Sequence, residues 1–311
     1  MADPLILARG FHFAMTVLAS GTICFMTLVA EPAARAPGSQ TLAGYAALRR
    51  QLTLLAALAL ILTVLSGAVW LALVAAGILG VPLANIWLDG GIWTVASETQ
   101  FGRIACARLI MAGVLGLLLA WPPTRWLQLL AGAGLVALIA PSGHAGATPG
   151  VTGAIQLISD GFHLLAAGAW LGGLPALVLL LGWSRHGAGP DRVTVAVNAT
   201  NRFSILGIVC VLTLAASGTV NSWVLLSGPR DLIATTYGRV LLLKIGLFAA
   251  MLGIAAVNRF CVTPRLTEPG AARALQLNSL AEATLGLGVL YLAAVLGTMA
   301  PAGHLHSNSA E

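Results

Sequence analysis

Residues 161–183 read GFHLLAAGAWLGGLPALVLLLGW, an apolar run long enough to cross the hydrocarbon core of a bilayer as one helix. Its one ionisable side chain, His163, lies in the first turn. The opening triplet, Gly161-Phe162-His163, is also found at Gly10-Phe11-His12, in another apolar run. The stretch therefore predicts a membrane-spanning helix, and its opening predicts that the chain contains one structural unit twice.

Three further phrases recur in the same order. The pairs are Ser66-Gly67-Ala68-Val69 with Ser217-Gly218-Thr219-Val220, Thr99-Gln100-Phe101-Gly102-Arg103 with Thr235-Thr236-Tyr237-Gly238-Arg239, and Pro141-Ser142-Gly143-His144 with Pro301-Ala302-Gly303-His304. We expect residues 1–150 and 151–311 to be two parallel four-helix repeats in one bundle, the second ending in a short periplasmic tail.

The composition excludes an ordinary soluble domain. Of 311 residues, 58% are hydrophobic and only 8% are charged. Because lipid satisfies no backbone polar group, the expected fold is an all-α membrane protein with eight transmembrane helices. The expected spans are residues 5–30, 49–78, 102–121, 125–141, 154–183, 203–226, 238–261 and 276–299. The net charge of +6 is dispersed over helix ends, so we expect no nucleic-acid partner. No catalytic motif is visible, and we expect no enzyme.

The arginines predict the orientation. Most of them lie in the connections after the first, third, fifth and seventh expected helices, which places these connections in the cytoplasm. Both termini then lie outside, in the periplasm if the cell is Gram-negative. With four crossings in each half, His12, His144, His163 and His304 all lie toward the periplasmic face.

These histidines are the candidate metal ligands. An ionisable side chain at membrane depth is a functional candidate by default, although His12 or His163 alone could be an interhelical hydrogen bond. His144 and His304 lie at the outer mouths of helices, and His306 adds an imidazole in the tail. We expect imidazoles from both halves to meet in a single pocket below the outer surface.

Two neighbouring side chains share helix faces with these histidines. Asp160 lies three residues before His163, and Met15 lies three residues after His12. Imidazole with thioether favours copper, since Met selects Cu(I) and His accepts Cu(I) or Cu(II), although Met on a membrane helix is more often packing. Asp160 corresponds to Arg9 in the first half. One asymmetric site, or a strong and a weak one, is therefore expected rather than two equal sites.

Buried charges give a possible pathway. Arg108 and Lys244 occupy equivalent positions inside helices and need partners. Asp160 is the first candidate for Lys244, and snorkelling to the surface is the alternative.

Glu282 is a further buried carboxylate, in the cytoplasmic half of the last helix. It either lies on the exit path of a cation or pairs with Arg202 or Arg259.

The second half also contains a longer set of phrases in order. They are Asp160-Gly161-Phe162-His163, Gly168-Ala169-Trp170-Leu171-Gly172-Gly173-Leu174, Asn201-Arg202-Phe203-Ser204, Ser217-Gly218-Thr219-Val220-Asn221, Tyr237-Gly238-Arg239 with Leu243-Lys244, Asn258-Arg259-Phe260 and Pro301-Ala302-Gly303-His304. Over residues 158–304 the chain resembles the CopD family of bacterial copper-resistance and copper-homeostasis proteins. The resemblance implies an inner-membrane protein that moves copper inward, with a separate periplasmic CopC-type carrier as a partner.

The leading hypothesis is a copper-binding membrane protein that takes copper at its periplasmic face and passes it toward the cytoplasm. The ion would be collected by His144, His304 and His306 and bound deeper by His12, His163, Asp160 and Met15. One alternative is a b-type haem protein that uses the paired histidines as axial ligands, with Arg108 and Lys244 holding propionates. Another is an assembly partner with no ion of its own.

Overall fold

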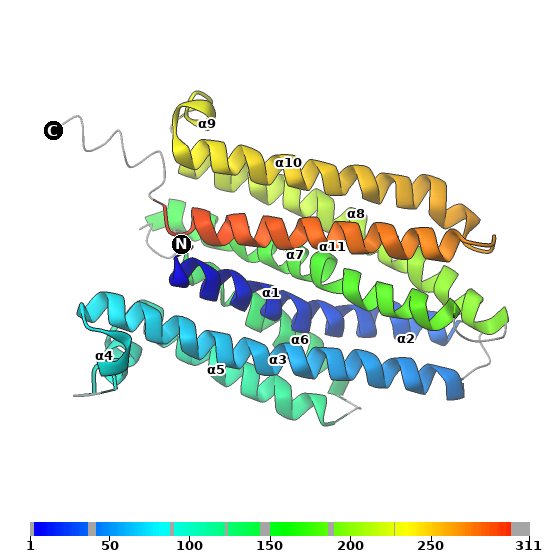
Figure 1. Cartoon of the computed structure of the whole chain (residues 1–311), viewed down its shortest axis with the longest axis horizontal. Helices are drawn as coiled ribbons and strands as arrows, with labels where there is room; N and C mark the ends of the chain where they lie inside the picture. The colour runs from blue at the N-terminus through cyan, green and yellow to red at the C-terminus, as the bar shows by residue number, and fades with distance from the viewer. Residues whose placement is uncertain are drawn as a thin grey trace.

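The computed structural model describes residues 3–36, 42–87, 90–121, 124–143, 150–185, 190–226 and 228–299 (Figure 1). All regular secondary structure in these ranges is helical. The long helices are α1 (Pro4–Phe25), α3 (Leu42–Leu79), α5 (Gln100–Leu119), α6 (Arg125–Ala137), α7 (Gly150–Arg185), α8 (Pro190–Leu225), α10 (Thr236–Val257) and α11 (Ala271–Leu296). The short ones are η1 (Met26–Ala30), α2 (Glu31–Ala34), η2 (Leu83–Asn85), α4 (Gly91–Glu98), η5 (Ala140–Ser142), α9 (Asp231–Ala234), η7 (Asn258–Val262) and η8 (Thr263–Arg265).

Eight helical spans in the described ranges are long and apolar enough to cross a membrane, as expected from the sequence. They are Pro4–Ala34, Gly44–Leu79, Gln100–Leu119, Arg125–Ser142, Gly150–Arg185, Asp191–Leu225, Thr236–Arg265 and Ala271–Leu296. The largest difference from expectation is the start of α8, at Pro190 rather than residue 203. Polar residues such as Asp191 and Arg202 fill that segment, so the helix continues beyond the stretch that hydropathy detects.

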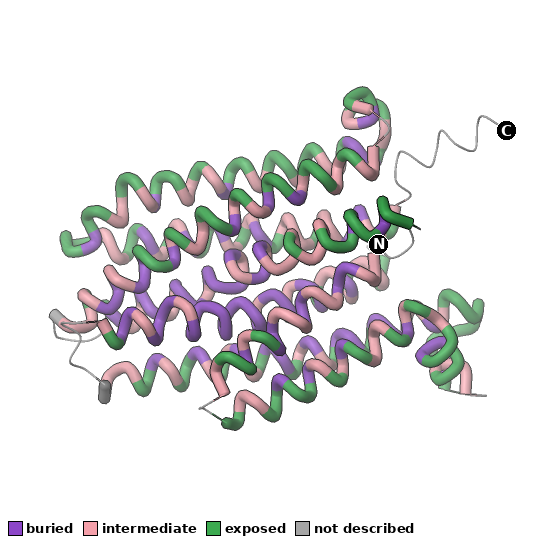
Figure 2. Tube along the Cα trace, turned by 180° about the vertical axis from the view of Figure 1, so that it is seen from behind, coloured by how far each residue is buried: buried purple, intermediate pink, exposed green. Residues whose placement is uncertain are grey.

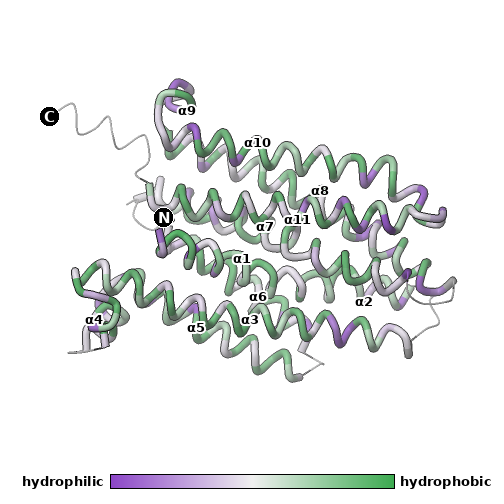
Figure 3. Tube along the Cα trace, in the orientation of Figure 1, coloured by the Kyte–Doolittle hydropathy of each residue, from purple (hydrophilic) through white to green (hydrophobic). Residues whose placement is uncertain are grey.

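The helices of the two halves lie beside one another. In Figure 1, α1 to α6 form the lower part of the molecule and α7 to α11 the upper part, and α1 and α7 run through the middle in the same direction. Helix α1 packs on α3, α6, α7 and α11, and α7 packs on α1, α8 and α11. Burial follows this arrangement, because the buried stretches concentrate on the central helices (Figure 2). Hydrophobic residues cover most of each long helix and hydrophilic ones gather toward the ends, which suits a bilayer (Figure 3).

Helices α1 and α7 touch through their backbones. A Cβ added at Gly21 would lie 2.3 Å from the carbonyl oxygen of Gly168 and 2.4 Å from Cα of Gly172. A Cβ added at Gly172 would lie 2.0 Å from the carbonyl oxygen of Val17 and 2.9 Å from Cα of Gly21. Small residues permit such close approach between membrane helices. The contact is reciprocal under the 151-residue shift of the sequence repeat, since Val17 corresponds to Gly168 and Gly21 to Gly172.

A matched pair of helix starts lies at the end of the molecule that carries α4 and α9 (Figure 1). Thr99 caps α5 by accepting a 2.9 Å hydrogen bond from the Gly102 backbone nitrogen, and Thr235 caps α10 by accepting one of 2.9 Å from Gly238. Both glycines lie against the preceding short helix, where a Cβ would be only 2.1 Å from a carbonyl oxygen. The repeated Thr-x-aromatic-Gly-Arg phrase therefore encodes one local structure in both halves.

Candidate functional site

The His12 cluster is buried between α1, α3 and α5. His12 is 3% exposed, and its Nδ1 lies 3.0 Å from both the Thr63 carbonyl oxygen and Ser66 Oγ. Because a carbonyl oxygen can only accept, Nδ1 carries the proton and Nε2 the lone pair. Arg108 donates a hydrogen bond from its guanidinium to that Nε2. Both ring nitrogens of His12 are therefore engaged by protein groups.

Aromatic rings and a second guanidinium close the space around His12. The Trp70 ring centroid lies 5.5 Å from that of His12 and 5.0 Å from that of Phe101. The guanidinium carbons of Arg9 and Arg108 lie 5.6 and 5.7 Å from the Trp70 centroid, within cation–π range. The cavity beside His12 has a volume of about 10 Å³, room for one water at most.

The His163 cluster lies on α7, α8 and α10, and its imidazole is half-buried. Nδ1 of His163 lies 2.9 Å from Ser217 Oγ. The Ser217 hydroxyl donates to the Thr213 carbonyl oxygen at 2.6 Å, so its oxygen accepts from the Nδ1–H of His163. Nε2 then carries the lone pair, and no residue in the described part of the chain makes a hydrogen bond to it. This is the orientation in which imidazole binds a metal, with its other nitrogen fixed by an acceptor.

Polar and charged groups surround His163. Asp160, on the same face of α7, accepts a hydrogen bond from the Asn221 amide. Lys244 of α10 lies within electrostatic range of both Asp160 and His163. The ion pairs of the described residues do not include a direct Lys244–Asp160 contact, although the two charges interact at longer range. Tyr237 also lies within electrostatic range of Asp160.

The two clusters occupy equivalent sequence positions. His12 and Ser66 are separated by 54 residues, as are His163 and Ser217, and both pairs are hydrogen-bonded. The positions that differ between the halves are Arg9 and Asp160, Trp70 and Asn221, Phe101 and Tyr237, and Arg108 and Lys244. Positions that carry aromatic rings and guanidinium groups in the first half thus correspond to positions that carry carboxylate, amide, phenol and amine groups in the second half.

The single pocket expected from the sequence is not formed by the described residues. His12 points toward α3 and α5, whereas His163 points toward α8. For His12 and His163 the expectation was wrong, because α1 and α7 meet through Gly21 and Gly172 while each imidazole is bonded within its own half. No group of three His, Cys, Asp or Glu side chains that could hold a metal occurs in the described ranges.

The remaining candidates fall into two groups. Three of them, His144, His304 and His306, lie outside the described residues. Met15 is half-buried on α1 and is absent from the residues that line the cavity beside His12.

Glu282 has a different partner from those we considered. Its Oε1 accepts a 2.6 Å hydrogen bond from Asn258 Nδ2, and it forms no ion pair with Arg202 or Arg259. The Arg259 guanidinium instead donates to Ser204 Oγ at 2.6 Å, and Arg202 is exposed. The alternative of an arginine partner is therefore wrong.

Sequence reasoning also missed several residues. It gave no role to Ser66 and Ser217, although their common 54-residue spacing from the histidines was a usable signal. It also missed Glu31, which is 7% exposed and forms ion pairs with Arg35, Arg49 and Arg125 at 3.3, 3.8 and 2.9 Å. The signal was a single acidic residue close to a group of arginines.

Two family models match the chain. Residues 197–296 match the family described as copper resistance protein D, and residues 1–154 match the family described as copper resistance protein D-like, N-terminal domain.

Individual proteins match as well. The chain is 32% identical to inner membrane protein YebZ of Escherichia coli over 75% of this chain and 82% of that protein. It is 30% identical to copper resistance protein D of Pseudomonas syringae over 70% of this chain and 75% of that protein. Copper transport protein CutJ of Bacillus subtilis is 35% identical over 53% of this chain and 29% of that protein. No solved structure matches the chain.

Proposed function

This chain belongs to the copper resistance protein D family, and from that premise we propose that it binds copper at its periplasmic face and passes it toward the cytoplasm. The proposal extends what relatives are named for: resistance to copper in one and transport of copper in another. The direction of copper movement and the residues that bind copper are our inferences. The protein spans the membrane, and family names point to copper handling rather than to an enzyme.

The single observation that carries the proposal is that Nε2 of His163 makes no hydrogen bond to any residue that the structure describes. The lone pair lies on Nε2 because the Nδ1–H of His163 donates a hydrogen bond to Ser217 Oγ. Imidazole binds both Cu(I) and Cu(II). Asp160, one turn earlier on α7, supplies a carboxylate that attracts a cation and can bind it or orient water around it. The positive charge of Lys244 interacts favourably with this carboxylate, and a bound copper ion would compete with Lys244 for it.

His12 is the weaker ligand in this proposal. The imidazole of His12 is the same tautomer as that of His163, but its Nε2 accepts a hydrogen bond from Arg108. Copper must therefore displace a guanidinium to reach this nitrogen. Met15 would add a thioether only if copper enters this first-half cluster. The asymmetry supports one strong site at His163 and one weak site at His12.

The first step of the proposal is the capture of copper at the periplasmic surface, by residues outside the described ranges. We propose that His144, His304 and His306 collect copper from a periplasmic CopC-type carrier and deliver it to His163. Periplasmic termini follow from the arginine-rich connections on the opposite side. The arginines that pair with Glu31 lie beyond the end of α1 that is far from His12. This position agrees with a cytoplasmic location for the arginine-rich connections.

We also propose that the two halves are parallel repeats. The equivalent His–Ser bonds, the equivalent Thr caps and the reciprocal Gly21–Gly172 contact support this arrangement. A haem held between His12 and His163 as axial ligands has no comparable support, because the two imidazoles point toward different helices.

Copper content of purified protein tests the proposal. We expect about one copper ion per chain in the wild type, a loss of more than about tenfold in His163→Asn, and little loss in the matched variant His12→Asn. A His163→Ala strain should also lose cellular copper accumulation. Copper retained in His163→Asn, or lost equally in both variants, would refute His163 as the primary ligand.

A further inference from the structure

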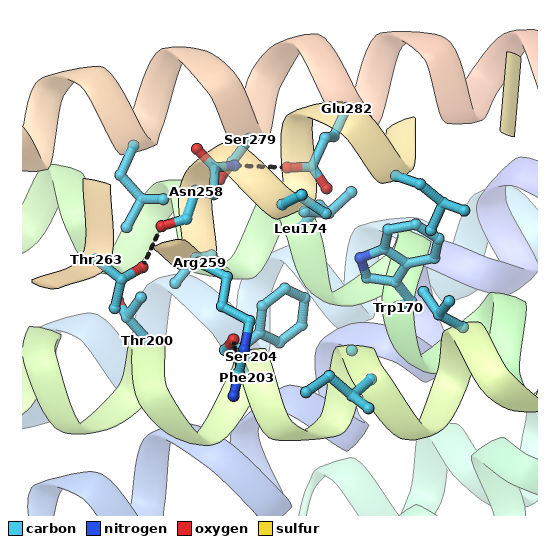
Figure 4. Close-up of a pocket in the computed structure, with 18 of the residues that line it drawn as sticks. Trp170, Leu174, Thr200, Phe203, Ser204, Asn258, Arg259, Thr263, Ser279 and Glu282 are labelled. Carbon is cyan, nitrogen blue, oxygen red and sulfur yellow. Dashed lines mark hydrogen bonds between the residues drawn. The ribbon is translucent and has the colours of Figure 1, made fainter. Parts of the chain in front are cut away.

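A second cavity lies in the half of the bundle away from the histidines. It has a volume of about 260 Å³, is open on one side, and is lined by residues of α7, α8, α10, η7 and α11 (Figure 4). Trp170, Leu174 and Leu177 line it from α7, about two to four turns beyond His163. Most of the lining is apolar, but one end contains Glu282, and Phe260, which is 71% exposed, marks where the cavity meets the surface.

The Glu282 carboxylate is held in a fixed position. Its Oε1 accepts from Asn258 Nδ2 at 2.6 Å, and Asn258 Oδ1 accepts from Asn278 Nδ2 at 2.7 Å. Asn258 is the first residue of η7, a π-helical turn of the kind often found at functional sites. The second carboxylate oxygen has no hydrogen-bond partner among the described residues. One oxygen is therefore anchored and the other is available to a ligand.

Two hydroxyl groups that line the same cavity also lack partners within the described ranges. They belong to Ser279, 1% exposed and one turn before Glu282 on α11, and to Thr200, 4% exposed on α8 (Figure 4). A buried hydroxyl without a hydrogen bond is costly, so its presence points to a bound water or ligand. The site thus offers a carboxylate oxygen and hydroxyl oxygens that protein groups leave unused.

The charge of Glu282 is not balanced by the residues around it. The only other charged residue that lines the described cavity is Arg259 of η7; the lining from α7, α8, α10 and α11 adds no further charged or titratable group. The Arg259 guanidinium is turned toward Ser204, as Figure 4 shows, and lies 5.8 Å from the Phe260 ring centroid. All the ion pairs of the described residues involve Glu31 instead. A carboxylate buried in a membrane protein without a cationic partner marks an ion pathway or relay.

We propose that this cavity is a cation site separate from the histidine clusters, in which Glu282 binds a hard monovalent cation with help from Ser279 and water. Oxygen ligands suit hard cations and not Cu(I), which prefers sulfur and imidazole. A single carboxylate matches one positive charge. The cations with this chemistry that are abundant at a membrane surface are the sodium ion, the potassium ion and the proton. Their binding at Glu282 does not depend on copper, whereas a role in driving copper movement rests on the function proposed above.

Thermal unfolding of purified, copper-free protein in detergent tests the site. The wild type is compared in sodium, potassium and choline chloride at fixed pH, and then in choline chloride over a pH series. A cation that binds only the folded state raises Tm, by several degrees at roughly 100 times its dissociation constant. We expect Glu282→Gln to lose this rise, Ser279→Ala to weaken it, and the exposed control Glu268→Gln to keep it.

Each result has a defined meaning. A rise in Tm that is specific to sodium or to potassium and is lost in Glu282→Gln identifies a site for that ion. A pH dependence of Tm that is lost only in Glu282→Gln identifies a proton site. If Glu282→Gln fails to fold, Ser279→Ala provides the comparison. Equal responses of all variants to every cation and pH would overturn the proposal. Because no copper is present, this failure leaves His163 as a copper ligand untouched, and failure of the His163 test leaves the cation site untouched.

Discussion

His12 and His163 each lie nine residues before a glycine of the α1–α7 contact, and each bonds through Nδ1 to a serine 54 residues later. Their Nε2 atoms have different neighbours. Arg108 engages Nε2 of His12, whereas the corresponding atom of His163 is free of hydrogen bonds to described residues. The comparison teaches that equivalent residues of the two halves fix the position of each imidazole and place its proton on Nδ1. The side chains contributed by neighbouring helices decide whether it can bind a metal.

Removing the Arg108 guanidinium should make the His12 cluster able to bind copper, as we propose for the His163 cluster. In Arg108→Leu, Nε2 of His12 loses its donor, and we expect copper content to rise from about one to about two ions per chain. The apolar replacement also removes a buried charge, so the fold should persist. The double variant His12→Asn/Arg108→Leu should return to one ion. A well-folded Arg108→Leu protein with unchanged copper would show that more than Arg108 closes the first cluster.

The two serines should differ in importance. Ser217 is the one acceptor that the described residues offer to Nδ1 of His163, so Ser217→Ala should lower copper affinity about 10- to 100-fold. Nδ1 of His12 keeps the Thr63 carbonyl as acceptor when Ser66 is replaced. Ser66→Ala should therefore leave copper affinity unchanged, as measured by competition with a chelator. Equal losses in both variants would contradict the assignment of the stronger site to His163.

The smallest expected effect is a change in Tm when the glycine beside either imidazole, Gly67 or Gly218, is replaced by alanine. A Cβ at Gly67 would lie 3.0 Å from Cε1 of His12, while one at Gly218 would lie 3.7 Å from Cε1 of His163. Alanine in place of a helical glycine stabilises by roughly 0.5–1 kcal/mol unless the site is too tight. Gly218→Ala should therefore raise Tm, and Gly67→Ala should lower it, because three hydrogen bonds keep His12 from moving. Tm shifts of the same sign in both variants would show that the rings adapt equally.

The spans could be predicted from the sequence because apolar length is a local property, readable without knowledge of neighbours. The exception, the start of α8, has polar residues that continue a helix past the apolar stretch. The matched Thr99 and Thr235 caps were also visible as a repeated phrase, since capping involves only residues close in sequence.

The site could be predicted only in part. The sequence indicated His12, His163 and their asymmetry, but the direction in which each imidazole points depends on the packing of α1 against α7. That packing is a contact between residues far apart in the chain. The same limit explains Glu282, for which an arginine partner was considered. The amide of Asn258 reaches the carboxylate because α10 packs on α11, a contact that spacing alone does not reveal.

The glycine contact between α1 and α7 has a consequence for the spacing of the two halves. Two helices whose backbones meet without intervening side chains cannot approach further. Even the methyl group of alanine at Gly21 or Gly172 would overlap backbone atoms of the other helix, so it would have to push the two helices apart. These two positions therefore set the shortest distance between the helices at the centre of the protein.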